Sequence, residues 1–169
     1  MISPALVLSA LLWLSPYYGD RGELPADRAA RLEPVAEAIS AVARNRVEVA
    51  LLLALGTHES HFSALVLAGR CTEIGPRACD SGRARGVWQL HREACPRAWE
   101  LPDGSRESLA EEARCVVSLL RWGAHQGTER ALTPLHAALS AYAGHGPTWP
   151  GAELRVRTTR KLLARLEGR

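Results

Sequence analysis

One acidic side chain follows the most apolar run of the sequence. Residues 47–55 are hydrophobic except for Glu48, and Glu59 comes four residues after this run. No other carboxylate lies between Glu48 and Glu73. At the C-terminal end of a buried helix, the helix dipole and poor solvation both favour the protonated carboxyl. A carboxyl that holds a proton near neutral pH can act as a general acid, so Glu59 is the first candidate catalytic residue.

Two further motifs follow this acid in order. Residues 59–60 are Glu-Ser, residues 84–90 read Ala-Arg-Gly-Val-Trp-Gln-Leu, and residues 138–144 read Ala-Leu-Ser-Ala-Tyr-Ala-Gly. This order resembles the lytic transglycosylases of the lysozyme-like superfamily (SLT-type domains). The family pattern is Glu-Ser, then Gly-Leu-Met-Gln-Ile, then Ala-Tyr-Asn-Ala-Gly. The resemblance covers roughly residues 47–146 and is that of a divergent member.

The resemblance implies a role for five residues. Glu59 matches the single catalytic acid/base of the family, and Ser60 matches the serine that hydrogen-bonds near the substrate. Gly86 and Gln89 match the motif that lines the substrate groove. Tyr142 matches the tyrosine that points at the catalytic acid, and its hydroxyl could donate a hydrogen bond to Glu59 or be satisfied within the core.

Two positions depart from the family pattern. Trp88 stands in place of Met, where it could stack on a sugar face or fill the core. Ala143 stands in place of Asn, so the geometry of the third motif is expected to differ. Trp149, a few residues on, could be a groove wall or a loop anchor.

The chemistry of glycosidic bond cleavage depends on how many carboxylates are present. A hydrolase usually uses two. A transglycosylase can use one, because the same Glu, once ionised, takes the proton from the 6-hydroxyl of the sugar. Glu73 and Asp80 are candidates for a second acid in the loop region, although each could simply be a solvated loop residue, and Asp80 could cap a turn.

Histidines on both sides of Glu59 offer a metal-dependent alternative. A zincin needs two His residues four apart with Glu directly after the first, whereas His58 and His61 are three apart. We therefore expect groove or surface histidines, with no metal and no cofactor.

The chain has four cysteines, an even number that allows three pairings. We expect Cys71–Cys79 to close a loop rich in Gly and Pro, and Cys95–Cys115 to join a short segment to the next helix. Buried thiols are the alternative, and zinc is disfavoured because there is no C-x-x-C pair. In an oxidising compartment each bridge would add about 2–4 kcal/mol, which suggests a periplasmic or extracellular protein.

The composition indicates a globular chain with one core. It has 169 residues, of which 47% are hydrophobic, and a net charge of only +3. The sequence has no basic stripe with interleaved aromatics, which argues against nucleic acid as a partner.

The apolar segment at residues 4–14 is too short to span a bilayer. It lacks a basic start, so we favour a packed first helix over an export signal.

The apolar spacing predicts a helix-dominated α+β fold. Helices are expected at residues 26–44, 47–58, 93–99, 105–125, 134–143 and 153–166, with a loop or irregular β-hairpin at residues 69–89. We expect an N-terminal segment and connector over residues 1–25 and a lysozyme-like catalytic domain over residues 26–169. The groove would lie between the Glu59 helix end and the hairpin.

The expected function is cleavage of β-1,4 bonds between N-acetylmuramic acid and N-acetylglucosamine by a monomeric protein that binds peptidoglycan strands. The alternatives are a lysozyme-type hydrolase with a second carboxylate and a non-catalytic wall-binding module.

Overall fold

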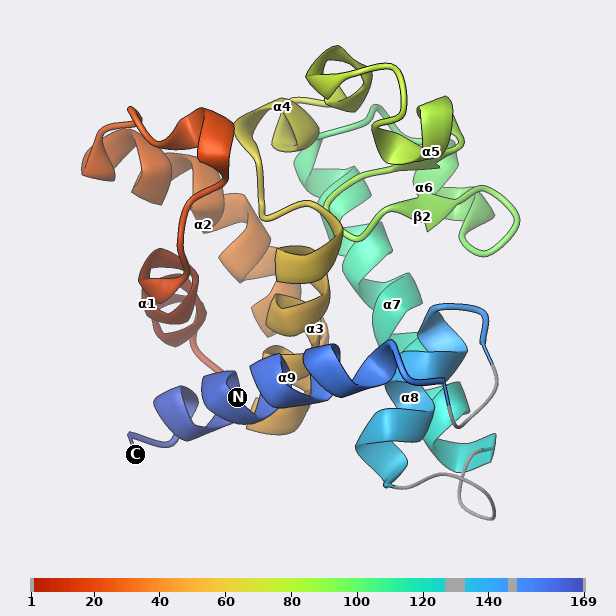
Figure 1. The fold of residues 1–169 in the computed structure, drawn as a ribbon. Helices are drawn as coiled ribbons and strands as arrows, with labels where there is room; N and C mark the ends of the chain where they lie inside the picture. The colour runs from red at the N-terminus through yellow and green to blue at the C-terminus, as the bar shows by residue number, and fades with distance from the viewer. Residues whose placement is uncertain (1, 127–132, 146–148, 169) are drawn as a thin grey trace.

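The computed structural model describes residues 2–126, 133–145 and 149–168 of the chain. Within these ranges the fold consists mainly of helices, with one short two-stranded sheet (Figure 1). The predicted helix-dominated α+β class is confirmed at this level. The expected domain of residues 26–169 includes residues 127–132, 146–148 and 169, which lie outside the described ranges.

Six helices of nine or more residues form the framework of the described part. They are α1 (Pro4–Trp13), α2 (Pro25–Val42), α3 (Arg46–Glu59), α7 (Arg106–Gln126), α8 (Pro134–Tyr142) and α9 (Ala152–Leu166). The shorter helical elements are η1 (Tyr18–Asp20), α4 (Ala64–Leu67), η2 (Cys71–Ile74), α5 (Cys79–Gly82) and α6 (Pro96–Trp99). Each helix predicted from the apolar spacing is present, with ends shifted by three residues or fewer.

Helix α3 is the central helix of the fold. Every residue from Val49 to Gly56 is buried, as expected of a helix that is apolar on all sides. The helix begins where the Asn45 side chain accepts a hydrogen bond from the Glu48 N–H at 3.0 Å, and it ends at Glu59. Helix α9 lies across α3 (Figure 1), so it covers the helix that ends at Glu59.

Side-chain caps define the starts of two further helices. The Ser105 hydroxyl accepts from the Ser108 N–H, and the Thr133 hydroxyl accepts from the His136 N–H, both at 3.1 Å. These caps set the start of α7 and of α8, which pack closely against each other.

The N-terminal helix belongs to the same core as the rest of the described chain. Val7, Ala10 and Leu11 of α1 are buried in a single cluster with side chains from α2, α3, α7, α8 and α9. The apolar segment within residues 1–25 is thus a helix packed mainly on α2. No helix in the described ranges is both long and apolar enough to cross a membrane.

The only sheet in the described part of the chain is small and irregular. Strands β1 (Ala84–Arg85) and β2 (Leu90–His91) are antiparallel, with Ala84 opposite His91. Both expected disulfides are present: Cys71–Cys79 closes the loop before β1, and Cys95–Cys115 joins the start of α6 to α7. The first bridge closes a loop within this mostly non-helical region, and the second fixes the region to the core helix α7.

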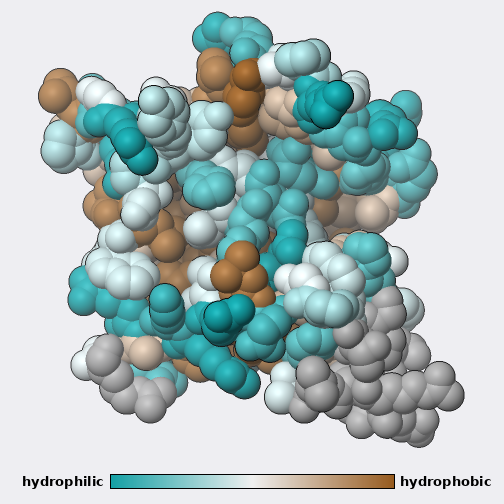
Figure 2. Space-filling model, viewed as in Figure 1, coloured by the Kyte–Doolittle hydropathy of each residue, from teal (hydrophilic) through white to brown (hydrophobic). Residues whose placement is uncertain are grey.

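The face shown in Figure 2 is largely hydrophilic. Hydrophobic atoms show on its left side, at its top and in a small patch near its centre. This view gives no sign of a broad apolar surface over α9.

The contact between α7 and α8 depends on one glycine. A Cβ at Gly123 would lie 2.5 Å from the Ala141 side chain and 3.2 Å from the Ala138 Cα. We expect Gly123→Ala to lower the free energy of unfolding by about 1–3 kcal/mol in urea titrations, despite the better helix propensity of Ala. Gly22→Ala, whose Cβ would meet nothing within 4 Å, is the control and should leave stability near that of the unmodified chain. Equal stability of the two variants would contradict this account of the packing.

Candidate functional site

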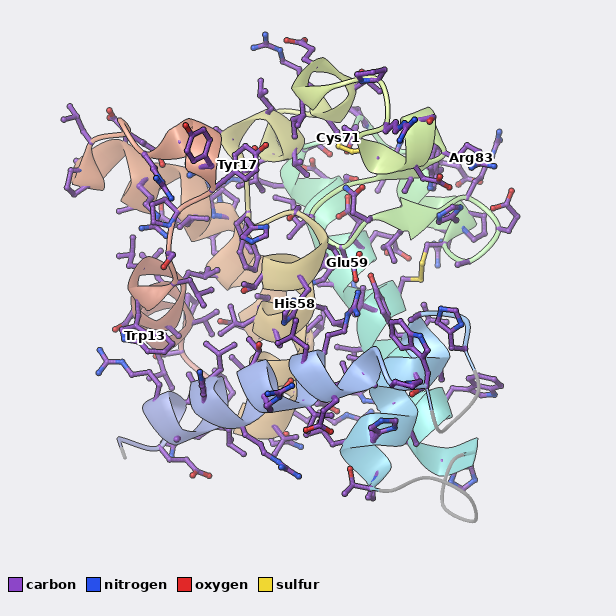
Figure 3. All side chains as sticks on the ribbon, in the orientation of Figure 1. Trp13, Tyr17, His58, Glu59, Cys71 and Arg83 are labelled. Carbon is purple, nitrogen blue, oxygen red and sulfur yellow. A yellow bond between two sulfur atoms is a disulfide. The ribbon has the colours of Figure 1, made fainter. Side chains whose placement is uncertain are left out.

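Glu59 lies in a hollow near the centre of the molecule (Figure 3). This hollow has a volume of about 320 Å³ and is also lined by Gln89, Tyr142 and Arg155. The Glu59 side chain is 21% exposed, so it is accessible without pointing into bulk solvent. Side chains from all three sequence motifs therefore line one surface, although the motifs are tens of residues apart.

A second hollow also borders Glu59. Its volume is about 170 Å³, and it is lined by Ser60, His61, Tyr17 and other residues. Among the described residues that line them, Glu59 and Gln89 are the two that both hollows have in common.

An arginine that the sequence analysis did not identify pairs with the acid. Arg155 Nη2 donates to Glu59 Oε1 at 2.7 Å, across 96 residues of sequence. Arg155 lies in the first half of α9, which is tied to α3 by a 2.9 Å hydrogen bond between His58 Nε2 and Thr158 Oγ1. The guanidinium also lies over the Trp149 ring at 5.2 Å. The site thus contains a carboxylate–guanidinium pair where the sequence led us to expect a protonated carboxyl.

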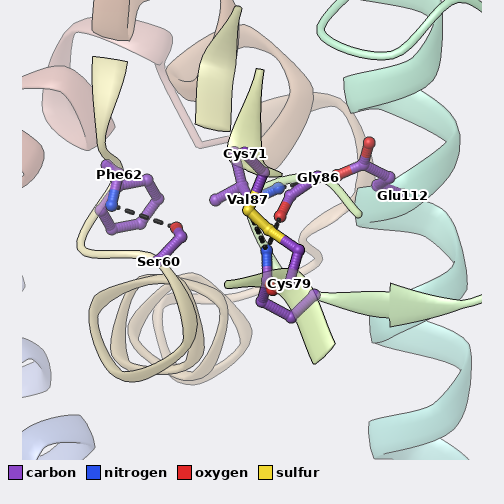
Figure 4. Close-up of a disulfide and its surroundings, with 8 residues drawn as sticks. Ser60, Phe62, Cys71, Cys79, Gly86, Val87 and Glu112 are labelled. Carbon is purple, nitrogen blue, oxygen red and sulfur yellow. Dashed lines mark hydrogen bonds between the residues drawn. A yellow bond between two sulfur atoms is a disulfide. The ribbon is translucent and has the colours of Figure 1, made fainter. Parts of the chain in front are cut away.

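The turn after Glu59 has an unusual backbone. His61 and Phe62 both have positive φ angles, of 53° and 52°. The Ser60 hydroxyl accepts from the Phe62 N–H at 3.1 Å (Figure 4) and donates to the Gly56 carbonyl at 3.2 Å. Arg31 donates to the Phe62 carbonyl as well. The Ser60 hydroxyl, expected near the substrate, is thus engaged in closing the turn that follows the acid.

The second motif forms a tight turn that presents Gln89 to both hollows. Gly86 has a φ of +72°, and a Cβ there would lie 2.1–2.3 Å from the Glu112 carboxyl. Gln89 also has a positive φ, of 51°, and its side-chain amide donates to the Gly86 carbonyl at 2.8 Å. Only glycine fits at position 86, because both the φ angle and the space exclude a larger side chain.

The structure does not support sugar stacking by Trp88. Its side chain is fully buried, and its indole N–H donates to the Leu52 carbonyl at 2.9 Å. The residue that departs from the family Met is a core residue that holds the second motif against α3. Trp149, by contrast, is only partly buried, lines the larger hollow and stacks on His145 with ring centroids 4.3 Å apart.

Tyr142 lies in the site but does not hydrogen-bond to Glu59. Its hydroxyl donates to the Trp88 carbonyl instead. Burial, and then the nearby charge of Glu59, raise the pKa of Tyr142 well above its ordinary value, so the hydroxyl keeps its proton. Ala143, which stands in place of the family Asn, also lines the larger hollow.

The two proposed second acids lie in the loop region beside the hollows, and Asp80 Oδ2 is 3.6 Å from Nε2 of His91, which lines the larger hollow. Glu73 is exposed and pairs with Arg70 at 2.6 Å, and the hydrogen bond from Arg70 lowers the pKa of Glu73. Asp80 is exposed and pairs with Arg83 at 2.8 Å. Neither residue lines the hollows beside Glu59, so the structure gives no support to a second-acid role for either.

A different acid, Glu112, lies buried behind the second motif. Its carboxyl accepts from the Val87 N–H at 3.1 Å (Figure 4) and from the Ser108 hydroxyl at 3.0 Å. Burial is the main cause that raises the pKa of Glu112 to about 7, with a smaller contribution from Asp103. Sequence analysis did not identify it, although an acid three residues after buried Leu109 could have been recognised on the apolar face of α7.

Histidine metal chemistry finds no support in the described ranges. His58 is hydrogen-bonded to Thr158, and no group of three or more His, Cys, Asp or Glu side chains there is arranged to hold a metal ion.

Neither a protein-family model, nor a curated protein, nor a solved structure matches this chain. The function is therefore inferred from the site itself.

Glu112 makes stability depend on pH. Its pKa of about 7 in the folded chain exceeds the ordinary value of 4.5, so the stabilising contribution is complete below pH 4.5 and is lost as pH rises to about 7. We expect stability to fall by about 2–4 kcal/mol between pH 4.5 and pH 8, and Glu112→Gln to remove most of this fall. Urea titrations at several pH values measure it.

Glu107→Gln is the matched control, because Glu107 is an exposed acid on the same helix. It should keep the pH dependence of the unmodified chain. The same slope in the Glu112→Gln variant would show that Glu112 is not the group responsible.

Proposed function

We propose that this chain is a peptidoglycan-cleaving enzyme, a lytic transglycosylase with Glu59 as its single acid/base. The observation that carries the proposal is that Glu59 lines two hollows, with Gln89 lining both and Tyr142 lining the larger. A lysozyme-like arrangement, in which an acid at a helix end faces a groove beside a small hairpin, fits this geometry.

The proposed reaction has two proton transfers, one from Glu59 and one back to it, through the same carboxyl group. Protonated Glu59 donates to the bridging oxygen as the bond to the sugar C1 breaks. The resulting carboxylate then accepts the proton of the 6-hydroxyl, whose oxygen bonds to C1 and closes an anhydro ring. Glu59 ends the cycle protonated, and water does not enter the product.

The lining of the groove favours a transglycosylase over a two-carboxylate hydrolase. Among the described residues that line the two hollows, Glu59 is the only Asp or Glu. A hydrolase of the inverting type needs a second carboxylate across the bond to activate water. With Glu73 and Asp80 facing other partners, the single-acid route is the one the described side chains supply.

Other residues would bind rather than react. The Trp149 ring, partly exposed in the larger hollow, would stack on a sugar face in the role first considered for Trp88. Gln89 would donate or accept hydrogen bonds to the sugar amides and hydroxyls. The two disulfides are compatible with a periplasmic or extracellular setting, where peptidoglycan strands are the proposed partner.

A non-catalytic wall-binding module is the second candidate. It is favoured by the ion pair between Glu59 and Arg155, because a carboxylate held at 2.7 Å by a guanidinium must separate from it before it can carry a proton. Binding to purified walls without release of product would support this reading.

The proposal predicts that Glu59→Gln lowers the rate of wall clearing by at least about 100-fold, because an amide cannot donate and recover the proton. Turbidity clearing measures the rate, and circular dichroism checks that the variant folds. Glu73→Gln and Asp80→Asn, which make the same charge change at exposed loop sites, should keep the activity of the unmodified chain.

Mass spectrometry of the products separates the enzymatic alternatives. Anhydro-muramic ends, lighter by one water than reducing ends, are expected. Reducing ends would show that the chain is a hydrolase and not a transglycosylase. Full activity in the folded Glu59→Gln variant would show that Glu59 is not the catalytic acid/base.

A further inference from the structure

Arg155 has more hydrogen-bond donors than the described residues satisfy. One nitrogen pairs with Glu59, and Nη1 makes only a 3.4 Å contact with the Gly151 carbonyl. The buried Nε has no partner in the described part of the chain. The side chain nevertheless lines the larger hollow, so its guanidinium faces the space that a ligand would fill.

The charges in this hollow are balanced only while the ion pair is closed. Of its lining side chains, Glu59 and Arg155 carry opposite charges, and His91 and His145 are the other titratable groups besides Tyr142. When Glu59 takes up a proton for catalysis, the guanidinium loses its counter-charge while it remains only 18% exposed. A partly buried cation without a partner is costly, so an anion in the hollow would stabilise the protonated acid.

We propose that Arg155 binds a carboxylate of the glycan substrate and thereby releases Glu59 to take up its proton. This inference rests on the proposed function and names the part of the substrate that the same site recognises. N-acetylmuramic acid carries a lactyl ether that N-acetylglucosamine lacks. Its carboxyl is free in strands without stem peptides and is joined to a peptide with carboxylates of its own in intact wall. Planar guanidinium groups bind such carboxylates in bidentate fashion.

The exchange makes Arg155 a specificity-determining residue. A neutral polymer with the same β-1,4 linkage, such as a chitin oligomer, brings no carboxylate and leaves the Glu59–Arg155 pair closed. A muramyl strand opens the pair, and one proton enters the site from solvent as the strand binds. Selectivity for muramyl glycan and protonation of the acid are then the same event.

The binding experiment uses the Glu59→Gln variant, which cannot turn over and whose Arg155 has lost its internal carboxylate. We expect it to bind peptide-free muramyl strands at least about tenfold more tightly than chitin oligomers of equal length by isothermal titration calorimetry. Adding Arg155→Gln should abolish this preference. Adding Arg157→Gln, an exposed arginine on the same helix that pairs with Glu153, should preserve it.

Proton uptake on strand binding gives a second readout besides the affinity. Titrations of muramyl strands in buffers of different ionisation enthalpy should show uptake of close to one proton by the unmodified chain and none by Glu59→Gln. Peptide-bearing strands form the second arm. Binding equal to or tighter than that of peptide-free strands assigns Arg155 to a peptide carboxylate, and weaker binding assigns it to the lactyl carboxylate, which the stem peptide converts to an amide.

Two results would overturn the inference: a muramyl preference that survives Arg155→Gln, or strand binding without proton uptake. Failure of the proposed function is a separate result. It would appear as an unmodified chain that cleaves no glycan, whether or not that chain prefers muramyl strands in the binding experiment.

Discussion

The ion pair between Glu59 and Arg155 is the interaction on which the site depends. A carboxylate at the C-terminal end of an apolar helix faces the negative end of the dipole, so it needs a cation or a proton. The fold supplies the cation from α9, held in place over α3 by the hydrogen bond between His58 and Thr158. The same contact joins the last helix to the central one and sets the charge state from which any reaction begins.

The second motif is shaped from behind by buried groups. The Glu112 carboxyl accepts a hydrogen bond from the Val87 N–H. The Trp88 indole donates a hydrogen bond to the Leu52 carbonyl of α3, and the Trp88 carbonyl accepts one from the Tyr142 hydroxyl. These contacts leave Gln89 as the member of the turn that faces both hollows. Buried contacts therefore fix much of the motif, while Gln89 lines both hollows and Leu90 lines the larger one.

Sequence reasoning recovered the features that depend on local spacing. The apolar periodicity located the helices to within three residues, and loop composition identified both cysteine pairs. It did not identify Arg155, because nothing near residue 155 indicates a partner 96 residues earlier. It also left open a sugar-stacking position for Trp88 in the groove, because apolar periodicity does not indicate whether a side chain in a turn points into the core or outwards. The burial of Glu112 could have been inferred from its position on the apolar face of α7, but Glu112 belongs to none of the sequence motifs.

The position of Arg155 in the last helix has a consequence for biosynthesis. Until residue 155 has left the ribosome and α9 has docked, the nascent chain carries Glu59 at the exposed end of a very apolar helix, without its cation. Completion of the site thus depends on the docking of α9. A chain without the part of α9 that includes Arg155 would lose both the surface that covers α3 and the cation that pairs with its terminal acid, so the packing of α3 and the completion of the site depend on the same helix.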